Sequence, residues 1–206
     1  MEGAKYVCSP PLRDRAAQDA LWDHLRMGTF DCVSSDHAPY RFDDTGKFLH
    51  GDAPPYPRIA NGMPGLAARL PFLFSDGVMT GRMSPSRFAA LSATNAARVF
   101  GLTAKGRIAP GMDADLAIWN PEAKRVMRAA DQGDAMDYTP FEGREITGWP
   151  ETVIARGAVI VANGAVTAAP GRGRFVARAR TDLTGIPGHR AAELDPARNF
   201  DAQVAP

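Results

Sequence analysis

The chain has 206 residues, enough for one sizeable domain or for one domain with a smaller appendage. Apolar residues make up 45% of it, so a packed core is expected rather than disorder. The 24 basic and 23 acidic side chains are interspersed and the net charge is only +1, which argues against nucleic acid or a membrane surface as partner.

The sequence also carries no sign of membrane insertion or export. Its longest apolar runs are broken by charge or glycine well short of the roughly 20 residues that span a bilayer. Residues 1–12 contain no apolar stretch of signal-peptide length. The two cysteines, Cys8 and Cys32, lack the spacing of a metal site. These features predict a cytoplasmic protein.

The first predicted elements are a helix and a strand. Apolar residues recur every four positions over residues 13–27, which predicts an amphipathic helix that ends at Gly28. Residues 30–35 are then predicted to form a short strand that ends at Asp36. This order resembles one step of a parallel barrel, in which chemistry takes place at the carboxyl ends of the strands.

A long segment without periodicity follows, and after it more helices. Residues 37–61 are rich in Pro, Gly and Asp, and a loop of this length in a compact domain is more often functional than idle. A helix is predicted over residues 65–75. Ser84 and Pro85 then supply an N-cap and a first-turn proline for another helix, and a short one follows at about residues 94–100.

From about residue 105 the pattern becomes β-like. Asn163-Gly164 between two β-prone runs predicts a hairpin, because a type I′ turn needs positive φ at both central positions. Beyond residue 178 the composition predicts a loosely held tail. The predicted strands are residues 115–119, 153–155, 158–161 and 165–168.

Asp36 is the most conspicuous candidate for chemistry. A carboxylate at a strand end suits a metal ion and can accept a proton from metal-bound water. Composition alone, however, favours a turn or N-cap residue. The neighbouring His37 is interpreted as structural or as a residue that supports a metal ligand without binding the metal, because the histidines of this chain form no His-x-His or His-x-x-x-His motif.

Other polar motifs have ordinary interpretations from pattern alone. Ser9 has no adjacent base, and the chain has no Gly-x-Ser-x-Gly elbow, so a serine hydrolase is disfavoured. The segment 61–65 is either a plain turn or a place where Gly62 and Gly65 allow close approach to a ligand. Residues 171–174 are interpreted as a flexible basic turn rather than a phosphate or RNA motif.

Several motifs together resemble the dihydropyrimidinase/D-hydantoinase family of the amidohydrolase superfamily. Each is weak alone, but their shared order along the chain is specific. The motifs are Cys8-Ser9-Pro10-Pro11-Leu12-Arg13, Ser35-Asp36-His37-Ala38-Pro39-Tyr40, Asn61-Gly62-Met63-Pro64-Gly65-Leu66, Ala93-Thr94-Asn95-Ala96-Ala97, Gly111-Met112-Asp113-Ala114-Asp115-Leu116, Thr147-Gly148-Trp149-Pro150 and Ala169-Pro170-Gly171-Arg172-Gly173-Arg174-Phe175.

The resemblance implies an α/β fold: the C-terminal part of a metal-dependent (β/α)8 barrel in residues 1–104 and a β-sandwich segment in residues 105–175. Residues 176–206 would form a flexible tail. It also implies two zinc ions bridged by hydroxide and a carboxylated lysine, and a hydroxide that opens a cyclic amide to an N-carbamoyl amino acid. Asp36 would ligate one zinc ion and take the proton, and Ser9 and Asn61 would hold the substrate.

One departure from the family pattern changes the expectation for this chain. The other metal ligands of the family, an early His-x-His, the lysine and two later histidines, lie upstream of the segment that matches Cys8, where this sequence has only residues 1–7. A single carboxylate does not hold zinc against water, so the isolated chain is expected to be inactive. In a complete protein, a small cyclic amide and a homo-oligomeric partner are expected.

Two alternatives remain open. Besides a fragment of the hydrolase, they are a non-catalytic scaffold or interaction protein related to dihydropyrimidinase, and the second half of an enzyme whose N-terminal half is separately encoded. Retention of Asp36 argues mildly against the scaffold.

Overall fold

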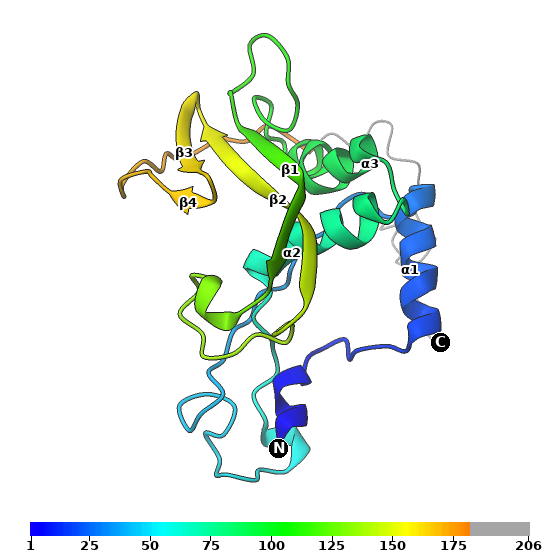
Figure 1. Ribbon diagram of the computed structural model, residues 1–206, viewed down its shortest axis with the longest axis vertical. Helices are drawn as coiled ribbons and strands as arrows, with labels where there is room; N and C mark the ends of the chain where they lie inside the picture. The colour runs from blue at the N-terminus through cyan, green and yellow to red at the C-terminus, as the bar shows by residue number, and fades with distance from the viewer. Residues whose placement is uncertain (182–206) are drawn as a thin grey trace, which may run out of the picture.

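The computed structural model describes residues 1–181, and residues 182–206 of the predicted tail lie outside the described residues. The fold is mixed α/β, with short helices on one side and an antiparallel sheet on the other (Figure 1). No helix within residues 1–181 is long and apolar enough to cross a membrane.

The helices precede the sheet in the chain. The helix α2 (Leu66–Phe72) continues without a break into a π-helical turn at Leu73–Met79, and α3 (Pro85–Ala89) into another at Ala90–Thr94. The remaining helical elements are α1 (Arg15–Met27), α4 (Asn95–Val99) and 3-10 turns at Glu2–Tyr6, Tyr56–Arg58 and Ala129–Asp131.

The ends of α1 and α3 follow the capping chemistry that the sequence indicates. The Asp14 side chain accepts a hydrogen bond from the Ala17 N–H at 2.9 Å, so α1 begins two residues after the predicted start. Gly28 ends α1 in the left-handed region with φ 95°. Ser84 Oγ likewise accepts from Arg87 N–H at 3.1 Å, which confirms the predicted N-cap of α3.

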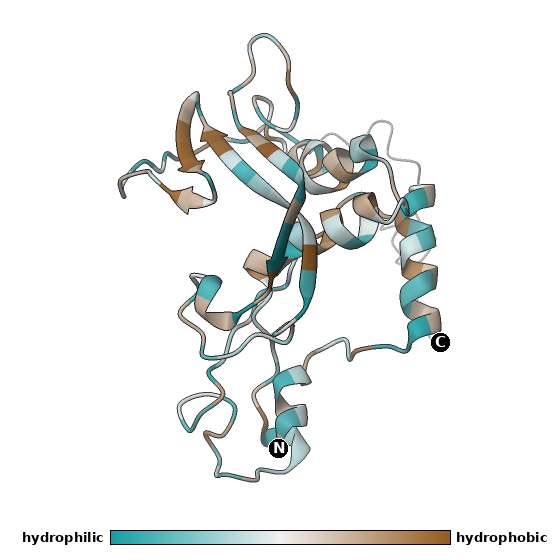
Figure 2. Ribbon diagram, viewed as in Figure 1, coloured by the Kyte–Doolittle hydropathy of each residue, from teal (hydrophilic) through white to brown (hydrophobic). Residues whose placement is uncertain are grey.

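Four strands form an antiparallel meander in the order β1-β2-β3-β4. Both residues of the Asn163-Gly164 turn have positive φ, 52° and 76°, which confirms the predicted hairpin. Figure 2 shows apolar residues along β3 and the adjoining end of β2. The strands are β1 (Leu116–Val126), β2 (Glu145–Ala155), β3 (Ala158–Ala162) and β4 (Ala165–Val166).

The prediction of a strand at residues 30–35 was wrong, because no strand is present there. A strand needs a neighbouring strand to pair with its backbone groups, and the described chain offers this segment none. Helix side chains bind its carbonyls instead: Arg87 Nη2 donates to Phe30 O at 2.8 Å and Asn95 Nδ2 to Asp31 O at 2.8 Å. The segment is therefore fixed by α3 and α4 rather than by a sheet.

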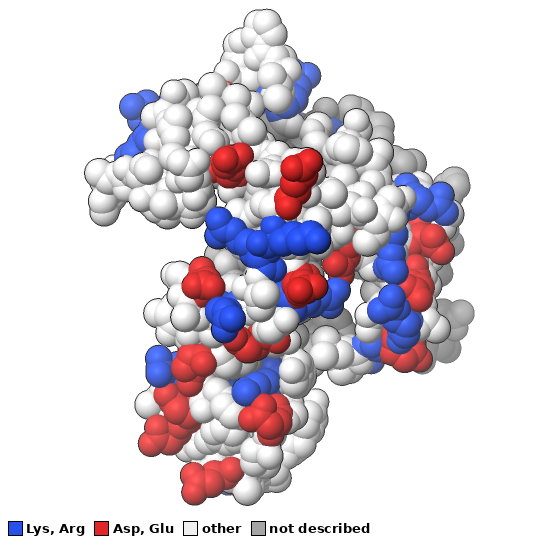
Figure 3. All heavy atoms as spheres, viewed as in Figure 1, with Lys and Arg blue, Asp and Glu red and all other residues white. Residues whose placement is uncertain are grey.

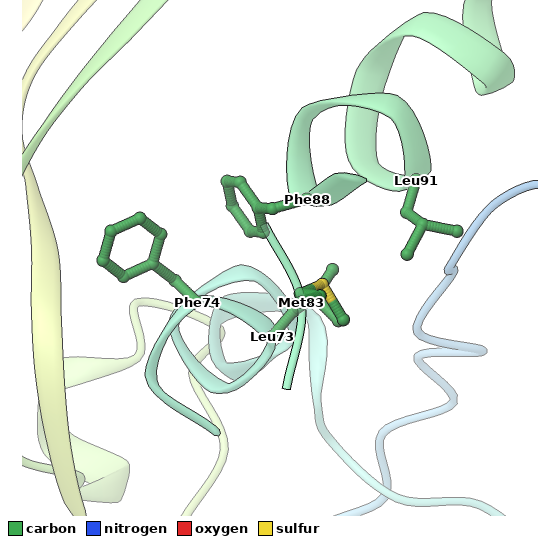
Figure 4. Packing of buried hydrophobic residues seen from close by; sticks show 5 residues of the cluster. All are labelled: Leu73, Phe74, Met83, Phe88 and Leu91. Atoms are coloured by element: carbon green, nitrogen blue, oxygen red, sulfur yellow. The ribbon is translucent and has the colours of Figure 1, made fainter. Parts of the chain in front are cut away.

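Two apolar clusters join the helices to the sheet. In the first, Phe74 stacks on Trp119 of β1 with ring centroids 4.3 Å apart. Figure 4 shows side chains of this cluster converging between the helical segments. The second cluster joins Ala68 of α2 to Met127 and Ile146. The cores are therefore built from both halves of the chain. The labelled side chains of the first cluster are Leu73, Phe74, Met83, Phe88 and Leu91.

Candidate functional site

Three segments that are far apart in sequence meet at Gly62. The Gly62 N–H donates to Val7 O at 3.0 Å, and the Ala38 N–H donates to Met63 O at 3.2 Å. Gly62 has φ 154°, and a Cβ at this position would collide with Ala38. The missing side chain at Gly62 thus allows packing within the chain, where the sequence left open a close approach to a ligand.

The same meeting point forms one wall of a cavity of about 750 Å³. Ser9, Asp36 and Asn61 all line this cavity. Trp22 of α1 and Arg69 of α2 line other parts of it, so both helices contribute to its wall. The structure therefore brings the three predicted site residues to one concave surface.

Asp36 has an unusual backbone conformation, and its carboxylate has no partner among the described residues. Its φ of 45° places it in the left-handed region, which non-glycine residues adopt only at a steric cost. The residue is exposed, and within residues 1–181 its carboxylate accepts no hydrogen bond and forms no ion pair. A strained residue with a free carboxylate facing a cavity is a combination often found at functional sites.

The side chain of His37 contacts the start of α2 rather than the cavity that Asp36 faces. Its Nδ1 accepts hydrogen bonds from the N–H groups of Gly65 and Leu66, at 3.1 and 3.2 Å. These N–H groups open α2 and have no partner within the helix. His37 therefore acts as a cap that ties the Asp36 segment to α2, which is a structural role. A further role behind a metal ligand stays a prediction.

Charged side chains from several elements line the cavity, and none of those below was predicted as a site residue. Arg82 Nη2 lies 3.4 Å from Asp19 of α1, and its guanidinium lies over the Trp22 ring at 5.3 Å. Arg144 pairs with Asp76, and both line the same cavity. Figure 3 shows acidic and basic side chains along α1, the helix that carries Asp19, so its sequence pattern resembles that of an ordinary solvated helix face.

Lys47 is a further residue that the pattern did not reveal. It belongs to the aperiodic segment 37–61, yet its side chain is completely buried, at 0% exposure. A lysine in a polar loop is ordinarily exposed, so no local signal distinguishes this one. The hydrogen bonds of its ammonium group all go to the two segments that carry Ser9 and Asn61, and the same group lies 5.9 Å from the centre of the Tyr40 ring.

The described residues do not fit a two-zinc site on their own. No group of three or more His, Cys, Asp and Glu side chains within residues 1–181 is placed to hold a metal ion. Around the cavity, Asp36 supplies an unpaired carboxylate, whereas Asp19 and Asp76 are engaged by arginines. A structural or catalytic zinc ion needs at least three protein ligands.

Comparison with known proteins defines the class. A model of the amidohydrolase family matches residues 7–160, and the chain belongs to this family. Within the family the chain is similar to D-hydantoinases and a dihydropyrimidinase, which confirms the resemblance predicted from the motifs.

The similarity covers most of this chain but a smaller share of its relatives. A D-hydantoinase from Ralstonia pickettii is 43% identical over 178 residues, 86% of this chain and 38% of the relative. The crystal structure of dihydropyrimidinase from Brevibacillus agri matches with a TM-score of 0.80 at 39% identity, over 86% of this chain and 38% of that one. A crystal structure of D-hydantoinase matches with a TM-score of 0.82 at 38% identity, over 88% and 39%. The chain thus spans less than two fifths of these relatives.

Proposed function

We propose that this chain is part of a hydrolase that opens cyclic amides, namely dihydropyrimidines and 5-substituted hydantoins, to N-carbamoyl amino acids. The observation that carries the proposal is the convergence of Ser9, Asp36 and Asn61 on one cavity. These are the positions to which the family resemblance assigns substrate binding and proton transfer. The D-hydantoinase relatives support the class of substrate.

Within this proposal each residue has a role suited to its surroundings. The free carboxylate of Asp36 binds metal and accepts a proton, because no neighbouring group among the described residues neutralises it. Ser9 and Asn61 hold the cyclic amide, largely through their main-chain groups. An exposed, unpaired carboxylate in a cavity favours an enzyme over the scaffold alternative.

The metal site requires ligands from outside residues 1–181. Zinc would supply hydroxide at neutral pH when bound, and Asp36 alone does not retain it. We therefore expect the isolated chain to be inactive, and the remaining ligands to come from an N-terminal barrel segment, on the same chain or on a separately encoded one. In this arrangement residues 1–104 form the last part of the barrel, residues 105–175 part of a β-sandwich, and the whole enzyme a cytoplasmic homo-oligomer.

A zinc-supplemented hydrolysis assay with dihydrouracil and a hydantoin tests the proposal. The purified 206-residue chain is expected to show no turnover, whereas coexpression with the N-terminal part of a D-hydantoinase is expected to restore zinc binding and turnover. Asp36→Asn in the restored complex should lower kcat at least about 100-fold, because one metal ligand and the proton acceptor are lost together.

Two results would contradict the proposal in different ways. Metal-dependent turnover by the purified chain alone would show that it does not need outside ligands. A restored complex that binds zinc stoichiometrically and hydrolyses neither substrate would exclude the proposed reaction.

A further inference from the structure

Lys47 is the one buried charged side chain among the described residues. Its ammonium group donates to three main-chain carbonyls: Ala60 O and Gly62 O, each at 2.7 Å, and Val7 O at 3.2 Å. These bonds use all three donors of the ammonium group. No carboxylate of residues 1–181 forms an ion pair with it, and burial lowers the pKa of Lys47 below its usual value.

The three carbonyls belong to the two segments that carry Ser9 and Asn61. Ala60 and Gly62 flank Asn61 on both sides, and Val7 lies two residues before Ser9. A hydrogen bond from the Gly62 N–H to Val7 O, at 3.0 Å, joins the same two segments directly. One ammonium group therefore sets the distance between them.

Ser9 and Asn61 themselves are left free within this arrangement. Among the described residues, neither their main-chain groups nor their side chains form a hydrogen bond, and both residues are exposed to the cavity. Their neighbours are fixed and their own polar groups are open to a ligand.

We propose that Lys47 is a positioning residue, whose ammonium group aligns the main chain on both sides of Asn61 with the segment leading to Ser9. The aligned groups of Ser9 and Asn61 then form a fixed gap for a planar cyclic amide. The identity of the ligand rests on the proposed function, whereas the alignment does not. A displacement of about 1 Å in such groups is enough to lower a rate or an affinity about 100-fold.

Amide hydrogen exchange on the 206-residue chain tests the alignment without any assay of activity. Lys47→Met removes the ammonium and keeps an apolar stem, and it is expected to speed exchange of the Gly62 amide at least 10-fold. The amides that pair β1 with β2 should remain protected. Lys124→Met, at an exposed lysine of β1, is the matched control and should change neither.

General destabilisation is distinguished by a second variant. Leu91→Val weakens the core, where Leu91 is 0% exposed, at a site away from Lys47. If Lys47→Met and Leu91→Val speed exchange at Gly62 and in β1–β2 in the same proportion, Lys47 is an ordinary core residue and the proposal is overturned. Unchanged exchange at Gly62 in Lys47→Met overturns it as well.

The consequence for the ligand is tested in the restored complex described above. Lys47→Met should raise KM for dihydrouracil at least 10-fold while kcat changes less than threefold and zinc content stays the same, and Lys47→Arg should recover part of the loss. An unchanged KM beside a loosened Gly62 overturns the positioning role. If the unsubstituted complex has no activity, the proposed function fails, and the exchange experiment still decides the alignment.

Discussion

Asp36 and His37 are neighbours in sequence, but the structure gives their side chains separate surroundings. Asp36 faces the cavity without a partner among the described residues, whereas His37 binds the first N–H groups of α2. The ring atom Nδ1 serves as the acceptor for both N–H groups in this contact. The pair thus combines a carboxylate that is free to bind a ligand with an imidazole that is held by hydrogen bonds.

Replacing His37 should therefore affect stability through α2. His37→Ala is expected to lower the free energy of unfolding by about 1 kcal/mol, because two N–H groups lose their acceptor. His37→Asn should recover much of this loss, since the Asn Oδ1 atom occupies nearly the same place as Nδ1. Urea unfolding at pH 8 measures both.

The exposed His24 provides the control for that experiment. It contacts Thr29 at the end of α1, at 3.1 Å, and His24→Ala should change stability by less than about 0.5 kcal/mol. Equal losses in His37→Ala and His37→Asn would mean that the acceptor does not matter.

The family resemblance selected the candidate site residues in advance, and of these only Asp36 also stood out by pattern alone. Ser9, Asp36 and Asn61 could be selected because each lies in a motif with a recognisable order along the chain. Lys47 and the arginines of the cavity could not, because their environment depends on contacts with distant residues rather than on neighbours in sequence.

At the scale of elements, predictions succeeded where local chemistry determines the structure. The caps of α1 and α3 and the Asn163-Gly164 turn depend on nearby atoms alone. The strands β1 and β2 are longer than predicted, since Pro121 and Pro150 interrupt their β pattern while tertiary pairing continues past them. The strand prediction for residues 30–35 failed for the opposite reason. The composition of this segment is β-prone, but no strand of the described chain pairs with it.

The contact between β2 and the helices depends on a missing side chain at Gly148. Gly148 has φ 89°, and a Cβ there would collide with the Phe74 ring, which is held between Trp119 and Phe88. Gly148→Ala is expected to lower the free energy of unfolding by about 3 kcal/mol, from backbone strain and overpacking together. Thermal and urea unfolding measure the loss.

Gly143→Ala separates the two contributions. Gly143 also has a positive φ, 79°, but no atom lies within 4 Å of a Cβ built there. Its substitution should cost only the backbone strain, about 1 kcal/mol. Equal losses at the two positions would show that the Phe74 ring moves aside easily.

At the scale of the molecule, Tyr138 connects the later part of the chain to its beginning. The hydroxyl donates to Lys5 O at 3.4 Å, and the ring lies 5.7 Å from that of Phe42. Burial, with a smaller contribution from Asp137, raises the pKa of Tyr138 to about 12. The folded protein therefore favours the neutral phenol more strongly than the unfolded chain does.

This pKa predicts an alkaline loss of stability. Because the folded pKa lies above the ordinary value of 10.0, the contribution of Tyr138 is complete below about pH 10 and is lost as pH rises toward 12. Tyr138→Phe should have a flatter stability profile between pH 9 and pH 11, measured by urea unfolding. Parallel profiles for the two proteins would refute the assignment, since other titrating groups affect both equally.

The family could be predicted from the sequence, because the order of the motifs can be recognised without knowing which residues are in contact. The cavity could not, since it exists only when the segments around Val7, Ala38 and Gly62 meet. Contacts between these distant segments, rather than any single motif, create the surface of the cavity.

The left-handed backbone at Asp36 also bears on the history of the gene. Glycine adopts this conformation without steric penalty, whereas an aspartate is held in it at a steric cost that the proposed role of the carboxylate would explain. Under the proposed chemistry, a duplicated copy released from ring opening would accept other residues at this position. Natural variation at position 36 is therefore a gauge of whether selection still maintains catalysis in this lineage.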